Sequence, residues 1–293
     1  MDIKQVVPEN LYREEWEAIE DEKTQPRCLG KIITISYKEF SEKVLEQDPR
    51  FVRDVVHSLY SGDVYILKQG FSEKFMRDIT EKLHQHGQQT PSSFHKMLDG
   101  CPDFHRAITP ELAKNYSMRQ IKHAYYFFPW NNDPYNLLES VNQRWRIFKF
   151  LGGFPLHAYE NNLPSEGVVD RLQICQYPSG VGELELHSDP YLYQKMSISG
   201  IMSKRGVDYQ TGGAYILNTN KEKIDVEDDL EIGDIYLIYP TVHHGVETID
   251  KGSEVDWNSF SGRWFMGLYS NASDVHRDRH TSYGVEERVL SVR

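Results

Sequence analysis

Cysteine is scarce in this sequence, and long apolar runs are missing. The three cysteines, at positions 28, 101 and 175 of 293 residues, form no Cys-x-x-Cys pair, which fits neither a disulfide framework nor a zinc ribbon. The longest apolar runs, such as residues 235–239, are the size of a strand and far short of the roughly 20 residues of a transmembrane helix. The first residues lack the basic and apolar regions of a signal peptide. We therefore expect a cytoplasmic protein that does not associate with membranes.

Basic side chains are also in short supply. The chain carries 33 Lys and Arg against 44 Asp and Glu, a net charge of -11. This balance opposes non-specific binding to phosphate backbones and to anionic lipid, although it allows a local basic pocket. We therefore expect no nucleic-acid partner. We expect a small-molecule substrate for a different reason, because the sequence contains no recognisable peptide-docking module.

Helical and strand signals alternate over the first 150 residues. They predict strands at 31–37 and 63–68, a helix over 38–60 interrupted near Pro49, a helix capped by Ser72 and ended by Gly87, and a helix over 134–150. Residues 88–118 are mixed and predicted to be rich in loops.

The character of the chain changes near residue 168. Short β-rich runs follow one another between turn residues, at 168–177, 182–189, 195–203, 213–218, 234–239, 244–249 and 263–269. This spacing is typical of a sandwich or jelly roll. We expect a mainly β protein with helical N-terminal support in a single domain: a mixed α/β supporting region over about 1–150, a β core over about 151–275, and a C-terminal tail or lid over 276–293.

Two His-x-Asp motifs occur, and chance alone gives about one in a chain of this composition. His187 and Asp189 lie at the end of a predicted strand, where side chains two residues apart point to the same face and can reach one metal ion. The other motif, His276-Arg-Asp278, belongs to a charged run that is typical of a solvated face or lid. Context therefore favours His187 and Asp189 as metal ligands.

Two further candidate metal ligands lie downstream, where the predicted strand 234–239 is followed by His243 and His244. Two imidazoles and one carboxylate leave three positions open on a metal, which suits non-haem Fe(II). Arg263 opens the last predicted strand. A guanidinium inside an apolar barrel needs an anion, and its planar fork matches a carboxylate. The alternative for Arg263 is a purely structural ion pair.

Taken in order, these segments resemble the 2-oxoglutarate/Fe(II)-dependent dioxygenases, especially the prolyl-hydroxylase-like branch. The resemblance covers roughly residues 168–270. It is carried by the Tyr-Pro…His-x-Asp segment 173–189, by Gly212-Gly213, and by the Gly-Asp…His-Gly-Val segment 233–246. It implies a double-stranded β-helix (a cupin-like jelly roll), Fe(II) held by His187, Asp189 and a distal histidine, 2-oxoglutarate held by Arg263, and O₂ as the second co-substrate.

Within this resemblance, His244 is the expected distal ligand because it occupies the histidine of His-x-Val, while His243 has the opposite strand parity. Arg263 follows His244 by 19 residues, a longer gap than the family usually has, and residues 250–262 are predicted to form an enlarged hairpin. Phe265 stands where the family often has a serine. Tyr177 is therefore our candidate for the second 2-oxoglutarate contact.

Gln173 and Glu185 share the inward parity of the metal ligands, so we expect them at the mouth of the site, in contact with substrate. Glu185 would then favour a substrate with an amine or guanidinium; the alternative is a solvated carboxylate on the rim. The aromatic cluster at 125–130 is expected in the core, with a substrate pocket as the second interpretation.

The expected activity is hydroxylation of an unactivated C–H bond of a small molecule, with release of succinate and CO₂. Asp189 stands where related halogenases carry a small residue, which favours hydroxylation, although desaturation and ring closure use the same ligands. Two alternatives stay open. One is a hydroxylase of protein residues, and the other is a non-catalytic β-sandwich that binds a metal or a carbohydrate. A structural metal site would be closed by four protein ligands.

Overall fold

A computed structural model describes residues 9–285 of the chain, and most of its strands form one curled series. The strands are β1 (Ile32–Ser36), β2 (Val64–Lys68), β3 (Phe104–Ile108), β4 (Gln120–Phe127), β5 (Val168–Pro178), β6 (Glu183–Ser188), β7 (Ser197–Ile201), β8 (Gly213–Leu217), β9 (Lys223–Asp225), β10 (Ile235–Ile238), β11 (His244–Glu247), β12 (Gly262–Ala272) and β13 (Tyr283–Gly284).

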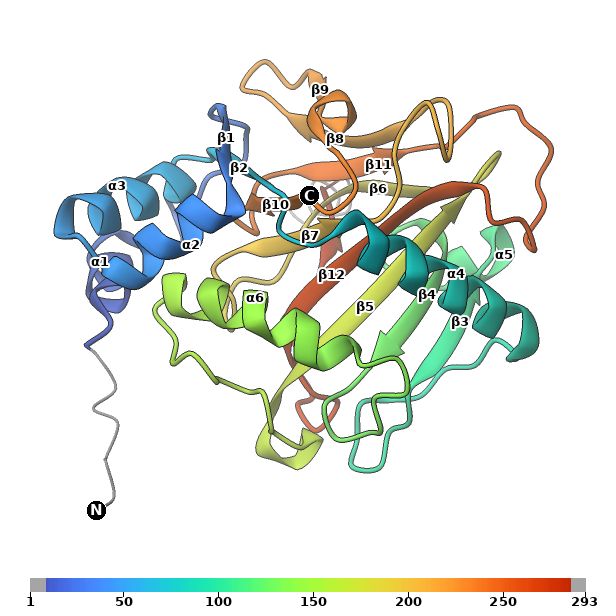
Figure 1. Ribbon diagram of the computed structural model, residues 1–293, viewed down its shortest axis with the longest axis horizontal. Coiled ribbons are helices and arrows are strands. Elements are labelled where there is room, and N and C mark those ends of the chain that lie inside the picture. Colours follow the sequence, from blue (N-terminus) through green and yellow to red (C-terminus); the bar gives the residue numbers. More distant parts are fainter. Residues whose placement is uncertain (1–8, 286–293) are drawn as a thin grey trace, which may run out of the picture.

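The strands curl into two layers joined through β4. The larger layer runs β1-β2-β10-β7-β12-β5-β4, with β3 on the outer edge of β4. The smaller layer runs β6-β11-β8-β9, with β13 added to β6. Nearly all neighbours are antiparallel, and β1 with β2 is the parallel exception. This is the expected double-stranded β-helix, or jelly roll, and its interior lies between the two layers (Figure 1).

The α-helices of the described residues all precede the β core, as expected for a helical N-terminal support. They are α1 (Leu11–Ile19), α2 (Tyr37–Glu46), α3 (Pro49–Tyr60), α4 (Glu73–Gln89), the short α5 (Pro110–Ala113) and α6 (Leu137–Leu151). Figure 1 shows α4 and α6 lying across the sheet of β12, β5 and β4, while α1, α2 and α3 gather near β1 and β2. The helices leave the opposite face of that sheet free to line the interior.

The predicted helix interruption near Pro49 is confirmed. Helix α2 is terminated by Gln47, whose φ of 52° is left-handed. Helix α3 then begins with Asp48 as its cap and Pro49 in its first turn. The prediction that Gly87 ends the next helix is wrong, since α4 continues to Gln89. Gly87 has a packing role instead, because a Cβ at this position would clash with the hydroxyl of Tyr125.

The β-rich runs predicted after residue 168 all form strands, but two strands of the first half were not predicted. Both β3 and β4 lie in or near the segment expected to be loop-rich, and β4 joins the larger layer to the smaller one by pairing with β5 and β6. Residues 250–262 do not close a hairpin. They carry the chain from β11, which pairs with β6 and β8, to β12, which pairs with β5 and β7.

Membrane crossing finds no support in the described part of the chain, where no helix combines the length and the apolar character that a bilayer span requires. The residues on which the signal-peptide expectation rests, 1–8, lie outside the described residues, as do residues 286–293 of the expected tail or lid. Of the charged run in that tail, His276, Arg277 and Asp278 are exposed, as predicted for a solvated face.

Candidate metal centre

Three potential metal ligands meet where β6 and β11 run side by side. His187, near the end of β6, is paired directly opposite His244, the first residue of β11, and Asp189 lies just beyond β6. The ligand atoms that these three side chains offer all lie within 4.8 Å of one another. The fold thus brings together the three residues expected from the sequence, on two neighbouring strands.

Both histidines are oriented by the backbone carbonyl of the residue two positions earlier in the chain. Nδ1 of His187 lies 2.9 Å from the carbonyl oxygen of Glu185, and Nδ1 of His244 lies 2.8 Å from that of Val242. A carbonyl oxygen only accepts, so each Nδ1 carries the proton and each Nε2 is left with a free lone pair. The Nε2 atoms lie 3.5 and 3.6 Å from the two oxygens of Asp189. This tautomer is the one that presents both Nε2 atoms to a single ion.

The protonation states of His187 and Asp189, which are both buried, also suit metal binding. Burial and the neighbouring His244 lower the pKa of His187. Burial would raise the pKa of Asp189, but the closeness of His187 and His244 holds that pKa well below its usual value. Metal ligation requires a neutral imidazole and an ionised carboxylate, so both shifts favour the form that binds an ion.

Two serines that no sequence pattern singles out hold Asp189 in place. The Ser197 hydroxyl on β7 donates to one carboxylate oxygen at 2.6 Å, and the Ser282 hydroxyl, just before β13, donates to the other at 2.8 Å. They come from segments far apart in the chain, which only the folded structure brings together. His243 takes no part in the cluster; its backbone N–H donates to the carbonyl of Arg27.

A small cavity of about 50 Å³ adjoins the three ligands and contains both predicted 2-oxoglutarate contacts. Tyr177 and Arg263 line it together with His187, Asp189 and His244. The hydroxyl of Tyr177 is buried and has no hydrogen-bond partner. Burial raises the pKa of this phenol well above its usual value, so it stays protonated and can donate. Its ring stacks on Phe265, with ring centroids 5.8 Å apart.

Arg263 is buried rather than turned to solvent, and it does form the ion pair considered as its alternative role. Its Nε donates to Glu227 at 2.5 Å, and both side chains are almost fully buried. Burial alone would lower the pKa of Arg263, but the charge of Glu227 and further nearby groups raise it above its ordinary value. The hydrogen bond to Glu227 uses Nε, so one side chain both forms the structural ion pair and lines the cavity.

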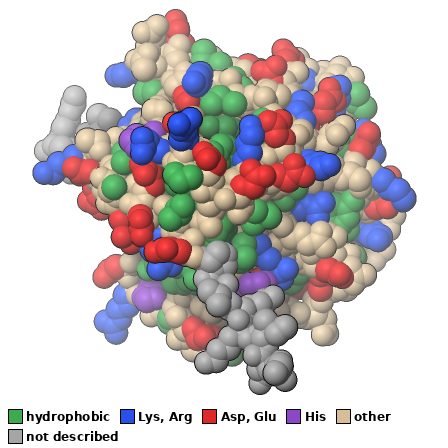
Figure 2. Space-filling view, turned by 60° about the vertical axis from the view of Figure 1, so that its left-hand side comes forward, with side chains coloured by type: hydrophobic (Ala, Val, Ile, Leu, Met, Phe, Trp, Pro, Cys, Tyr) green, Lys and Arg blue, Asp and Glu red, His purple; other side chains and the backbone are tan. Residues whose placement is uncertain are grey.

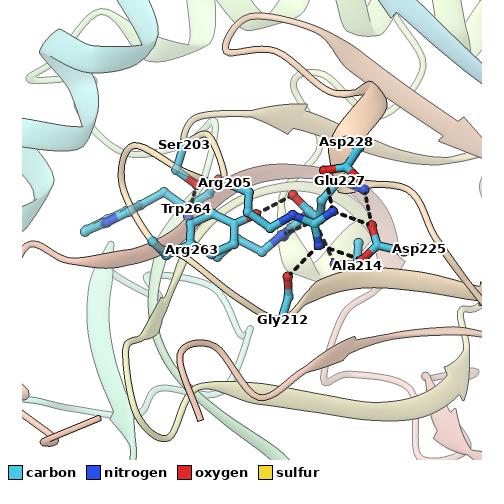
Figure 3. Close-up of polar contacts among 10 residues, drawn as sticks. Ser203, Arg205, Gly212, Ala214, Asp225, Glu227, Asp228, Arg263 and Trp264 are labelled. Carbon is cyan, nitrogen blue, oxygen red and sulfur yellow. Dashed lines mark hydrogen bonds and ion pairs between the residues drawn. The ribbon is translucent and has the colours of Figure 1, made fainter. Parts of the chain in front are cut away.

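Three donors fix Glu227, which makes it a rigid support for Arg263. Figure 3 shows Glu227 together with Arg263 and Ala214. Besides Nε of Arg263, Glu227 accepts from the backbone N–H of Ala214 at 2.7 Å and from the hydroxyl of Tyr209 at 2.5 Å. Gly213 permits this approach: its φ is +126°, and a Cβ there would clash with the Glu227 side chain. The second glycine of the Gly212-Gly213 motif therefore has a physical reason.

A larger cavity of about 320 Å³ also reaches His187 and Asp189. The sequence predicts Gln173 at the mouth of the site, and this residue lines the larger cavity. Glu185 lines neither this cavity nor the small one. Its carboxylate instead lies close to Gly284 of β13, where a Cβ would collide with it.

Several residues of the two cavities were not identified from the sequence. Ser199 and Tyr236 line the small cavity, and Arg106, Lys122 and Arg171 line the large one. Strand parity could have found Arg171, which shares its face of β5 with Gln173 and Tyr177. Arg106 and Lys122 lie on β3 and β4, which were not predicted, so no strand parity was available for them.

No family model and no curated protein matches the sequence. Several solved structures, however, are similar to this chain. A prolyl-4-hydroxylase from Pseudomonas putida aligns with 74% of this chain and 96% of its own, at 11% identity and a TM-score of 0.44. A Neurospora crassa protein in complex with alpha-KG and thymine aligns over 86% and 88% at 14% identity and a TM-score of 0.45. A prolyl hydroxylase from Trichoplax adhaerens, in complex with a hypoxia inducible factor peptide, aligns over 85% and 96% at 13% identity and a TM-score of 0.46.

At identities this low the function has to be argued from the side chains of the site itself.

Proposed function

We propose that the protein is an Fe(II)- and 2-oxoglutarate-dependent oxygenase that hydroxylates an unactivated C–H bond of a small molecule and releases succinate and CO₂. One observation carries this proposal: two imidazole Nε2 atoms and one buried carboxylate converge next to two cavities. Within residues 9–285 the cluster consists of these three ligands and no fourth. Three ligands leave positions for exchangeable groups, whereas a structural site is closed.

The donor set fits ferrous iron. Two neutral imidazoles with one carboxylate form the facial arrangement of non-haem Fe(II) oxygenases. Ser197 and Ser282 would hold Asp189, and the carbonyls of Glu185 and Val242 would hold the two histidines. Such supporting contacts orient the ligands before the ion arrives.

We assign the small cavity to 2-oxoglutarate because of its lining, in which the Tyr177 hydroxyl is unpaired. A buried donor without a partner is unfavourable unless a ligand supplies an acceptor. The distal carboxylate of the co-substrate would accept from Tyr177 and from Arg263, whose guanidinium Glu227 already orients. When bound, iron, 2-oxoglutarate and O₂ supply the oxidising power for C–H hydroxylation, while this chain's residues position them and exclude water.

The large cavity favours a small-molecule substrate over a protein residue. Its volume of about 320 Å³ lies in the range of ordinary small-molecule pockets. Asp189 favours hydroxylation, as argued from the sequence. We further place the enzyme in the cytoplasm, supported by three cysteines that are free. We treat the chain as one domain, because β2 and β4 of the first half pair with β10 and β5 of the second.

The test is 2-oxoglutarate turnover with the histidines as matched variants. The wild type, loaded with Fe(II) in air, should convert 2-oxoglutarate to succinate, slowly without substrate and faster with it. His187→Ala should abolish succinate release, while His243→Ala, one residue from the proposed ligand, should retain it. Turnover that survives in His187→Ala would sink the catalytic assignment and leave the non-catalytic binding protein as the better interpretation.

A further inference from the structure

The large cavity contains cationic side chains that no acidic group neutralises. Arg106 on β3, Lys122 on β4 and Arg171 on β5 all line it. In the part of the chain that the structure describes, no ion pair or side-chain hydrogen bond involves any of the three. Buried guanidinium nitrogens are left without a partner on both arginines: Nε and Nη1 of Arg106 and Nε of Arg171.

Aromatic rings hold these cations in place instead of carboxylates. The guanidinium carbon of Arg106 lies 4.3 Å from the ring centre of Phe94, and that of Arg171 lies 5.3 Å from the ring centre of Tyr269. Nζ of Lys122 lies 5.8 Å from the ring centre of Tyr177. Stacking on a ring orients a cation but leaves its N–H donors unsatisfied. An anionic ligand would satisfy them.

The acidic groups of the same cavity are already engaged. Asp274 pairs with Arg279, and Asp189 belongs to the proposed metal centre. The outer surface differs, because acidic and basic side chains are interspersed on the face shown in Figure 2, and the whole chain carries -11. A cluster of unpaired cations inside an acidic protein is therefore a local feature that calls for a local counter-charge.

The three cations and Arg263 line different cavities, although Lys122 also contacts the ring of Tyr177, a proposed co-substrate residue. Arg263 lines the small cavity, whereas Arg106, Lys122 and Arg171 line the large one. The large cavity also reaches His187 and Asp189, so a molecule held by the cations could present a C–H bond to the metal. Aromatic rings form part of its remaining wall, with Phe104 and Tyr126 stacked at 4.6 Å between ring centroids.

We propose that the substrate is an anion, a carboxylate or phosphate ester on an apolar or aromatic body, whose charged group is bound by Arg106, Lys122 and Arg171. This inference rests on the proposed function, since it takes the large cavity as the substrate site. It replaces the expectation from Glu185 of a cationic substrate, because Glu185 does not line the cavity.

The test is binding of simple probes to anaerobic protein loaded with Fe(II) and saturating 2-oxoglutarate, followed by titration calorimetry. The probes are benzoate, phenyl phosphate and the uncharged benzamide. With the co-substrate site filled, we expect benzoate or phenyl phosphate to bind and benzamide to bind much more weakly. The tighter of the two anions identifies the carboxylate or the phosphate as the recognised group.

Charge-neutral variants locate the binding. Arg106→Gln, Arg171→Gln and Lys122→Met should each weaken the anion on the order of tenfold, the usual effect of losing a hydrogen bond to a charged group. Arg53→Gln, an exposed arginine on α3, should leave it unchanged. Circular dichroism would check that each variant is folded.

Three outcomes would overturn the inference: no anion binds, benzamide binds as tightly as the anions, or the cavity variants weaken 2-oxoglutarate instead of the probe. The last result would assign these cations to the co-substrate. The binding assay needs no catalysis, so failure of the proposed function is distinguishable. If probes bind through these residues but succinate is never released, the oxygenase proposal fails and the anion site stands.

Discussion

His187 and His244 face each other across an antiparallel pair of strands, with their ring centres 4.2 Å apart. Nδ1 of His187 donates to the carbonyl of Glu185 and Nδ1 of His244 donates to that of Val242, so the two Nε2 atoms are left to face Asp189. Direct pairing of β6 with β11 thus defines the site before any ion binds.

The first prediction concerns this pair. His244→Ala should weaken binding of Co(II), a spectroscopic stand-in for Fe(II), by well over tenfold, because it removes a ligand rather than a supporting contact. His243→Ala should bind Co(II) as the wild type does. Titration of the visible Co(II) spectrum measures both. Equal losses in the two variants would contradict the assignment of His244.

A second prediction concerns the supports of Asp189. Ser197→Ala and Ser282→Ala should each reduce metal affinity by about tenfold or more, because each removes a hydrogen bond that orients the carboxylate. Ser199→Ala, two residues along the same strand from Ser197, is the matched control. Metal affinities unchanged in Ser197→Ala and Ser282→Ala would show that Asp189 needs neither support.

A third prediction is that Tyr177→Phe lowers the affinity for 2-oxoglutarate without lowering the stability of the protein. We expect 2-oxoglutarate to bind about tenfold more weakly to this variant, because a hydrogen bond to a carboxylate is lost. The free energy of unfolding without ligand should not fall, since the deleted hydroxyl has no partner in the folded protein. The charge-transfer band of the Fe(II) complex measures the first quantity and urea denaturation the second. A large loss of stability with unchanged 2-oxoglutarate affinity would reverse the interpretation.

Glu227→Gln should destabilise the protein by about 3 kcal/mol, because it leaves the buried Arg263 without its counter-charge. Glu231→Gln removes the acid of an exposed pair with Lys204 and should cost less than about 1 kcal/mol. Urea denaturation of both variants gives the comparison. Similar small losses for the two would indicate that Arg263 finds another buried partner.

The stacked pair His105 and His123 predicts an acid-sensitive step in stability. Burial, together with the neighbouring His105, lowers the pKa of His123 from 6.5 to about 4. Its Nε2 faces the carbonyl of Trp257 at 3.1 Å and must donate, so Nδ1 accepts from His105 at 2.9 Å.

Between pH 6.5 and about 4 the unfolded chain binds a proton at His123 that the folded chain does not. Stability should therefore fall as the pH is lowered through this window, by up to about 3 kcal/mol from this group. His123→Asn should show a flatter dependence of the unfolding free energy on pH. Identical slopes for wild type and variant would refute this account.

The sequence was most informative where motif and strand parity coincide. His187, Asp189 and His244 were identified because an ordered set of motifs named them, and β6 and β11 then placed them together. The two serines that bond Asp189 could not be predicted from the sequence, because Ser197 and Ser282 lie on segments that only the complete fold brings together. The same holds for the ion pair of Arg263, whose partner lies 36 residues earlier in the chain.

Strand β4 shows why part of the fold was missed. Its inward residues Gln120, Lys122 and Tyr126 face a polar cavity rather than an apolar core, so the strand lacks the alternation of polar and apolar residues that normally reveals it. The polar residues that prevented prediction of β4, Lys122 among them, are also the ones that contribute charge to the cavity.

The last described strand has an energetic consequence. β13 pairs with β6 at Ser188 and His187, and Ser282 beside it bonds Asp189. If an ion binds more tightly when that strand is docked, linkage requires that the ion strengthen docking by the same free energy. Protection of the Gly284 amide from hydrogen exchange would then rise with metal occupancy. The exchange rate at β13 would therefore report the fraction of the protein that has metal bound.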